Sequence, residues 1–162
     1  MISDKVQKAI NDQITAEFDS SYLYLAMSAW CEEQNLKGFA RWMRVQAEEE
    51  KQHGFKLFDY LVDRGGKVVL GALGAPPENF DSIEDVFQKT LDHERKVTAR
   101  IHKLNELAIQ EKDHATVAHL QWFITEQVEE EASAEEILNQ IKMVEGRPGT
   151  IFYIDREVGR RE

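Results

Sequence analysis

The chain of 162 residues contains few of the residues that interrupt helices or cross-link segments: three prolines, nine glycines and one cysteine, Cys31. A single cysteine excludes an intramolecular disulfide and fits a reducing compartment, and no catalytic motif surrounds it, so we expect a buried helical residue. No apolar run approaches the length of a membrane-spanning helix, and the N-terminus lacks the apolar segment of a secretion signal. We therefore expect a cytoplasmic protein with no membrane partner.

Basic residues are also fewer than acidic ones: the chain has 20 Lys and Arg and 30 Asp and Glu, which gives a formal net charge of −10. Such a surface repels nucleic acid and anionic membranes, so neither is expected as a partner, whereas cations are attracted. A hydrophobic content of 42% over 162 residues predicts one domain with a single core.

Long segments rich in Ala, Leu, Glu, Gln and Lys predict an all-α fold. We expect helices at 4–34, 36–64, 82–110, 114–144 and 150–158. Ser3 or Asp4 is expected to cap the first helix, Asp81 the third and Asp113 the fourth. The short first and third connections make the helices on either side antiparallel neighbours.

The segment 65–81 contains Gly71, Gly74 and the pair Pro76-Pro77, which exclude a helix. A helix of about 28 residues spans roughly 42 Å, and about 16 extended residues reach roughly 53 Å. The segment can therefore run the length of the bundle and leave the second and third helices parallel. This predicts a four-helix bundle with one long crossover loop and a short C-terminal fifth helix.

Each long helix carries an apolar face that a polar residue interrupts close to its middle. The interrupting residues are Glu17, Glu50, Glu94 and Gln127. Mid-helix positions meet at one height in a bundle whichever way each helix runs, so these side chains should form one layer. His53 and Glu130 lie three residues after Glu50 and Gln127, on the same helix faces.

The layer would place the carboxylates of Glu17, Glu50, Glu94 and Glu130 beside His53 in a helical core. Without a counter-charge, desolvation and repulsion would cost much free energy or raise the pKa values strongly. Two divalent cations match four ionised carboxylates and a neutral imidazole. Oxygen ligands with an imidazole suit Fe, Mn or Zn, so the residues predict a two-metal site without selecting the metal.

The spacing of these residues resembles that of the non-haem bacterial ferritins. The residues that carry the resemblance are Glu17, Tyr24, Glu50, His53, Glu94, Trp122, Gln127 and Glu130. The resemblance covers essentially the whole chain, including the crossover and the fifth helix, and implies one ferritin-like domain over 1–162.

The resemblance also implies roles for individual residues. Glu17, Glu50 and His53 would hold one iron, and Glu50 would bridge to a second iron held by Glu94 and Glu130. Gln127 would be a hydrogen-bonding or weak ligand, and Tyr24 a partner of the ligands. A third iron site is implied at Glu49, Glu126, Glu129 and Glu130.

The implied function is iron storage and detoxification by a ferroxidase that uses O₂ or peroxide, in a hollow cage of twenty-four subunits. Bacterioferritins carry a haem-ligating methionine just after the bridging glutamate, where this chain has Lys51, so no haem is expected. They also carry a second Glu-x-x-His on the fourth helix, where Gln127 and Glu130 stand here. An amide at Gln127 should leave one iron less tightly held.

Two other classes of protein remain open. A different di-iron enzyme would need a substrate pocket or a redox domain, and a purely structural bundle would tolerate loss of the buried carboxylates. Neither requires a sealed shell, so the size of the oligomer would separate them from a storage protein. Trp122 is expected in the core near the site. Ordinary surface or interface positions are expected for His93, His102, His114 and His119.

Overall fold

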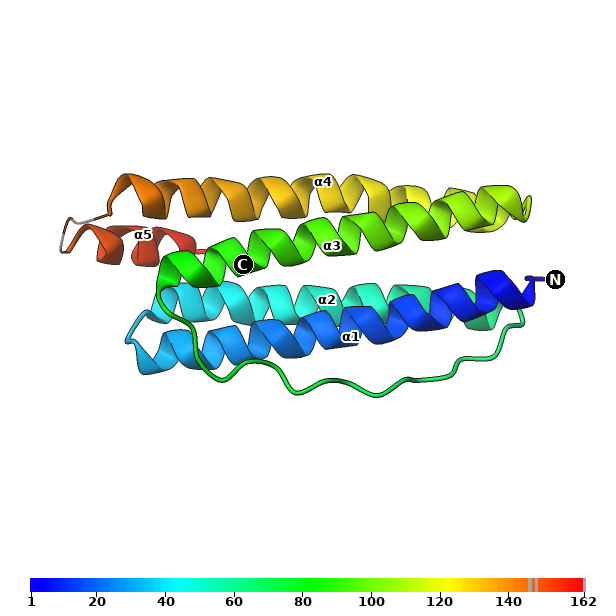
Figure 1. Cartoon of the computed structure of the whole chain (residues 1–162), viewed down its shortest axis with the longest axis horizontal. Coiled ribbons are helices and arrows are strands. Elements are labelled where there is room, and N and C mark those ends of the chain that lie inside the picture. Colours follow the sequence, from blue (N-terminus) through cyan, green and yellow to red (C-terminus); the bar gives the residue numbers. More distant parts are fainter. Residues whose placement is uncertain (146, 148, 162) are drawn as a thin grey trace.

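The computed structural model of the protein describes residues 1–145, 147 and 149–161. Its elements are α1 (Asp4–Glu33), α2 (Lys37–Asp63), α3 (Ile83–Gln110), α4 (His114–Met143) and α5 (Thr150–Val158). The helices α1 to α4 lie side by side along one axis, and α5 packs at one end (Figure 1). The predicted all-α four-helix bundle with a short fifth helix is confirmed. None of the helices in the described residues is long and apolar enough to cross a membrane.

The N-termini of α1, α3 and α4 are capped by short polar side chains. Ser3 caps α1 and Asp113 caps α4, as expected, each accepting a hydrogen bond from the backbone N–H three residues later. The cap of α3 is Ser82, which accepts from Asp85 N at 3.0 Å. The prediction of Asp81 was wrong by one residue: its own N–H donates to Asp85 Oδ2 at 3.1 Å.

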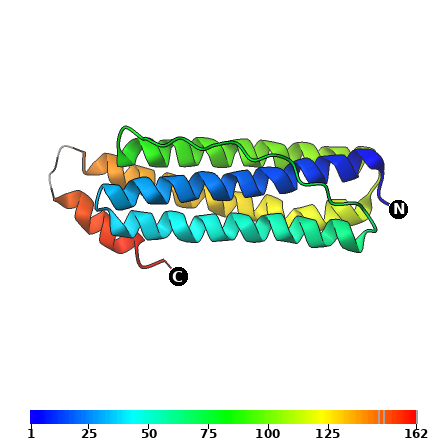
Figure 2. The ribbon, with the colours of Figure 1, turned by 90° about the horizontal axis from the view of Figure 1, so that it is seen from below.

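The crossover between α2 and α3 lies along the outside of α1 (Figure 2). Four α1 side chains, one from each successive turn, accept a hydrogen bond from a backbone N–H of the crossover at 2.8 to 3.0 Å. They are Gln7, Asn11, Thr15 and Asp19, which pair with Lys67, Val69, Gly71 and Gly74. Four helical residues advance about 6 Å and two extended residues advance about 6.6 Å, so the two segments stay in step from Lys67 to Gly71. The last step, to Gly74, takes three residues. The crossover therefore leaves α2 and α3 parallel.

The core consists of two apolar clusters at opposite ends of the bundle. One includes Tyr24, Met27, Phe39, Phe87 and Ile141, and the other includes Ile10, Ile14, Leu57, Ile101 and Leu120. Between them along every long helix lies a stretch whose buried residues are mainly polar. The two clusters fix the helices on either side of this layer. The positions of the polar side chains are therefore set by the apolar packing around them.

The helix α5 docks against the start of α2 by close backbone contact. Asp155 Oδ1 accepts a hydrogen bond from Phe39 N at 2.9 Å, which satisfies a free N–H in the first turn of α2. A Cβ atom added at Gly38 would lie 1.6 Å from the Asp155 carbonyl oxygen, and one at Gly159 would lie 2.7 Å from Gly38 Cα. The two glycines therefore permit a close contact between α5 and α2. After this contact the chain runs back along α2, where Arg161 lies.

Candidate metal centre

The polar layer gathers side chains from all four long helices. Glu17 comes from α1, Glu50 and His53 from α2, Glu94 from α3, and Gln127 and Glu130 from α4. All six are buried. Four carboxyl groups in the interior of one bundle are unusual, because carboxylates are rarely buried without a partner.

Two groups of possible metal ligands overlap at one residue. Glu17, Glu50 and His53 each offer a ligand atom, and these atoms lie within 4.8 Å of one another. Glu50, Glu94 and Glu130 form a second group under the same limit. Because Glu50 belongs to both, the arrangement fits two cations that share one carboxylate.

Two carboxylate oxygens in the centre lack a protein partner. Glu17 Oε2 and Glu50 Oε2 are buried and have no hydrogen-bond donor within the described part of the chain. His53 Nδ1 lies 3.6 Å from Glu50 Oε2, beyond a normal hydrogen bond. A buried oxygen without a donor is costly, and a cation bound between these groups would satisfy it. The donor set therefore fits a metal ion.

Two buried glutamines support the carboxylates from one turn earlier on the same helices. Gln13 Nε2 donates to Glu17 Oε1 at 2.7 Å. Gln46 Nε2 donates to Glu50 Oε1 at 3.1 Å and to Glu130 Oε2 at 2.7 Å. No role was expected for these glutamines, although a glutamine four residues before Glu17 and another four before Glu50 are a visible signal. Their amides hold one oxygen of each carboxylate and leave the other for a cation.

Glu94 is held from both sides. The Tyr24 hydroxyl donates to Glu94 Oε1, and Gln127 Nε2 donates to Glu94 Oε2 at 3.1 Å. Gln127 Nε2 also lies 3.2 Å from Thr98 Oγ1. In this arrangement Gln127 acts as a hydrogen-bond donor, one of the two roles that the resemblance implied for it.

Burial dominates the electrostatics of the layer. Desolvation raises the pKa of Glu17 and Glu50, and a neighbouring carboxylate raises each further, Glu50 acting on Glu17 and Glu94 on Glu50. Desolvation also raises the pKa of Glu94, against the Tyr24 hydrogen bond, and that of Glu130 to about 7. In the metal-free protein the centre retains protons at a pH where exposed glutamates are ionised. A cation would take the place of those protons.

Comparison with known proteins places this bundle and its centre in a family. Residues 7–144 match the family model of the ferritin-like domain. The chain belongs to the ferritin family. This confirms the resemblance, and membership supports a role in iron storage.

Relatives of this ferritin come from bacteria and archaea. It is 38% identical over 161 residues to a bacterial non-heme ferritin of Staphylococcus aureus, with 99% of this chain and 97% of the relative covered. It is 40% identical to a probable bacterial non-heme ferritin-like protein of Haemophilus influenzae, with 98% and 96% covered. The open-pore ferritin structure of the archaeon Archaeoglobus fulgidus superimposes with a TM-score of 0.99 at 45% identity, covering 100% of both chains.

In this ferritin, the four residues implied for a third iron site differ in burial and in the side chains that they contact. Glu126 and Glu130 form a further group with His53, with ligand atoms within 4.8 Å. Glu49 is half-buried and pairs with Arg161. Glu129 is exposed and belongs to none of the ligand groups found among the described residues. The four-residue site therefore stays a prediction.

Trp122 does not lie in the core. Its side chain is 39% exposed, and its ring packs edge-on against His53 with the centroids 5.3 Å apart. Trp122 lies four residues before Glu126, on the rim of the bundle. It is beside the centre, as expected, but it is not buried in the core. Lys56 Nζ lies 4.1 Å from its ring centroid, so the indole also covers a cation.

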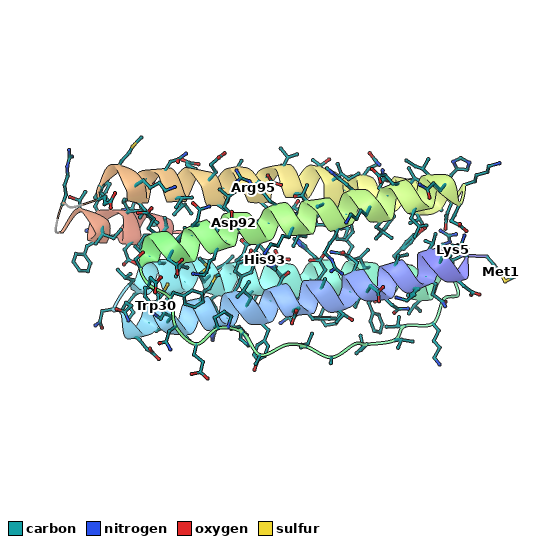
Figure 3. The ribbon with its side chains drawn as sticks, in the orientation of Figure 1. Met1, Lys5, Trp30, Asp92, His93 and Arg95 are labelled. Atoms are coloured by element: carbon teal, nitrogen blue, oxygen red, sulfur yellow. The ribbon has the colours of Figure 1, made fainter. Side chains whose placement is uncertain are left out.

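His93 is half-buried, whereas an ordinary surface or interface position was expected for it. Its Nε2 lies 2.7 Å from Ser20 Oγ on α1, and its ring packs edge-on against Tyr24 at 5.7 Å between centroids. Figure 3 labels His93 on the side of α3 that faces α1. Desolvation, with Lys96, lowers the pKa of His93 to about 4, so the imidazole is neutral. No sequence signal indicated this contact, because it depends on how α1 and α3 pack.

Proposed function

We propose that this ferritin oxidises Fe(II) with O₂ or peroxide at an intrasubunit centre for two ions and stores the Fe(III) as a mineral inside a hollow shell of subunits. The observation that carries the proposal is the sharing of Glu50 between two groups of buried ligands. The whole chain, 1–162, then works as a single ferritin-like domain. Its task is iron storage and detoxification in the cytoplasm.

Iron is the substrate, and each ion has its own ligands. Glu17, Glu50 and His53 hold one Fe²⁺, and Glu50, Glu94 and Glu130 hold the other, with Gln127 beside them. Each ion gives one electron: two Fe²⁺, one O₂ and two protons yield two Fe³⁺ and one H₂O₂. With peroxide as oxidant, two Fe²⁺, one H₂O₂ and two protons yield two Fe³⁺ and two waters. Paired ions therefore deliver two electrons together and avoid superoxide.

The protein environment favours this reaction in the forward direction. Carboxylates attract Fe³⁺ more strongly than Fe²⁺, because the interaction grows with the charge of the ion. The protons that the buried glutamates hold in the metal-free state leave when the ions bind. Tyr24 and Gln127 hold Glu94 in place throughout, so its oxygens need no reorganisation.

Storage requires an assembly and a route away from the centre. A homo-oligomer fits the ferritin relatives, and we propose a shell of 24 subunits. The ions are proposed to pass a third site at Glu49, Glu126, Glu129 and Glu130. Lys51 follows the bridging Glu50 and pairs with Glu48, so we assign no haem to this chain.

The test is aerobic addition of Fe²⁺ to metal-free protein, followed by size-exclusion chromatography with iron detection. We expect rapid oxidation and many ions per subunit eluting with one very large particle. Glu50→Ala should abolish the rapid phase, whereas Glu48→Ala should keep it, because Glu48 lies on the same helix but pairs with Lys51 at the surface. A small oligomer that retains only a pair of ions would contradict storage, and a chain that binds no iron would contradict the whole proposal.

A further inference from the structure

The C-terminal tail is connected to the metal centre through Arg161. Its Nη1 donates to Gln46 Oε1 at 2.8 Å, and its Nη2 pairs with the Glu49 carboxylate. Gln46 in turn donates through Nε2 to Glu50 Oε1 at 3.1 Å and Glu130 Oε2 at 2.7 Å. A continuous chain of hydrogen bonds thus runs from the tail to two carboxylates of the centre.

Arg161 is held in this position by contacts on three sides. Arg41 Nε donates to the Arg161 carbonyl oxygen at 3.1 Å, which fixes the backbone. The guanidinium lies over the Trp42 ring, 4.6 Å from its centroid, and only 24% of the side chain is exposed. The close contact between Gly159 and Gly38 sets the path of the tail just before it. This geometry differs from that of a freely solvated surface arginine.

The oxygens that Arg161 occupies are suited to a cation. Glu49 lines a groove of about 490 Å³ together with His53, Trp122 and Glu126. Glu126 and His53 already belong to a possible ligand group with Glu130. A cation in this region would find Glu49 engaged by a guanidinium, and it would find Gln46 turned with its amide nitrogen toward the centre. A positive side chain and a metal ion cannot both use one carboxylate at full strength.

We propose that Arg161 is a positioning residue that competes with a third cation for Glu49 while it holds the Gln46 amide toward Glu50 and Glu130. The inference rests on the proposed function, because it concerns the ions next to the paired site. Arg161 keeps Gln46 Oε1 and Glu49 away from the first two ions, which remain with the ligands bridged by Glu50. A third ion binds only by displacing the guanidinium from Glu49.

The test is a titration of metal-free protein with Co²⁺, followed by calorimetry and by the visible absorption of the bound ion. In Arg161→Gln the third ion should bind roughly tenfold more tightly than in the unaltered protein, because a competing ion pair is removed. The first two ions should bind somewhat less tightly, because the Gln46 amide loses the hydrogen bond that holds it toward Glu50 and Glu130. Arg160→Gln is the matched control: its guanidinium pairs with Glu157 on the surface at 3.1 Å, so binding of all ions should be unchanged.

A second variant separates competition for Glu49 from a loosened tail. Adding Glu49→Gln to Arg161→Gln should remove the gain in affinity for the third ion, whereas a purely structural effect of Arg161 would persist. Arg161→Lys, which keeps the charge but has no planar fork, should give an intermediate gain. Thermal unfolding monitors the fold of each variant.

A measurement on the unaltered protein tests the inference even if a variant fails to fold. Hydrogen exchange of the peptide covering 156–161 should speed up when Co²⁺ fills the third position, because the tail loses its contact with Glu49. Unchanged exchange at saturation, or equal affinity for the third ion in Arg161→Gln, would overturn the inference alone. Failure of the unaltered protein to bind a pair of ions would instead contradict the proposed function, and the inference with it.

Discussion

The hydroxyl of Tyr24 on α1 donates a hydrogen bond to Glu94 Oε1 on α3, which joins the two helices at the level of the metal centre. Tyr24 is fully buried, and its ring also contacts His93. Desolvation and the neighbouring Glu94 raise the pKa of Tyr24, so the phenol keeps its proton and remains a donor. With Gln127 on the other oxygen, Glu94 has one donor on each side.

Tyr24→Phe is expected to slow iron oxidation while the fold is kept. The change removes one donor to a carboxylate, and such a bond contributes about 1.5–3 kcal/mol, so the rate should fall by about tenfold or more. Stopped-flow absorbance after Fe²⁺ addition measures it. Tyr22→Phe is the control, because Tyr22 lies on the same helix but is 47% exposed. Equal rates for the two variants would contradict a role for the Tyr24 hydroxyl.

Gln127→Glu is expected to tighten binding of one of the two ions. It would add a carboxylate beside Glu94, and the extra charge should raise the affinity for that ion by about tenfold. The metal-free variant should be less stable at neutral pH, because another carboxyl group is buried near the others. Calorimetric titration with Co²⁺ distinguishes the two ions.

The control for this variant is Gln121→Glu, on an exposed part of α4 where Gln121 Nε2 donates to the Val117 carbonyl at 3.2 Å. It should leave both affinities unchanged. If Gln127→Glu bound both ions no differently from the unaltered protein, the amide would not be what weakens the site.

Periodicity explains why the buried polar layer could be predicted from the sequence. Glu17, Glu50 and Glu94 each interrupt an otherwise apolar helix face near its middle, and helix geometry alone brings such positions to one level. The crossover could be predicted for a similar reason, since length and the Pro76-Pro77 pair leave only an extended path.

Contacts that depend on packing between helices could not be predicted in the same way. His93 reaches Ser20 only because α1 and α3 lie close together there, and no spacing within α3 shows this. The link from Arg161 to Gln46 depends on α5 folding back against α2, through residues that are far apart in the sequence. The predicted cap of α3 was wrong for a local reason: Asp81 and Ser82 are both good capping residues, and the helix begins directly after Ser82.

The stability of the metal-free protein should fall as the pH rises from about 5 to 7. Glu130 has a pKa of about 7 in the folded state against an ordinary value of 4.5, mainly because it is desolvated. In that window the folded chain holds a proton that the unfolded chain has released. The stabilisation is therefore complete below pH 4.5 and is lost as the pH passes 7. The linkage is about 3 kcal/mol for this residue.

Denaturant unfolding of metal-free protein at several pH values measures this effect. Glu130→Gln should flatten the dependence, because the amide has no proton to lose, whereas the neighbouring exposed Glu129→Gln should not. Part of the dependence of stability on pH should remain in both variants, because the pKa values of Glu17, Glu50 and Glu94 are raised too. Equal slopes in the two variants, or stability that rises with pH, would be incompatible with a protonated centre.

Gly38→Ala is expected to displace α5 and, with it, Arg161. The new Cβ would lie 1.6 Å from the Asp155 carbonyl oxygen, a backbone atom that cannot move without the helix. Overpacking of this kind costs about 1–3 kcal/mol, which thermal unfolding would register. The variant should also bind the third Co²⁺ more tightly, as Arg161→Gln does, because the tail no longer reaches Glu49.

Gly74→Ala is the matched control, because a Cβ at Gly74 would meet only Asp19 Oδ1 at 3.9 Å, an ordinary contact. It should change neither stability nor Co²⁺ binding. If Gly38→Ala lost stability but bound the third ion as the unaltered protein does, α5 would be a structural element with no influence on the centre. If it gained affinity, the docking of α5 on α2 would be what delivers Arg161 to Glu49, and the state of the tail would determine how many cations each subunit holds.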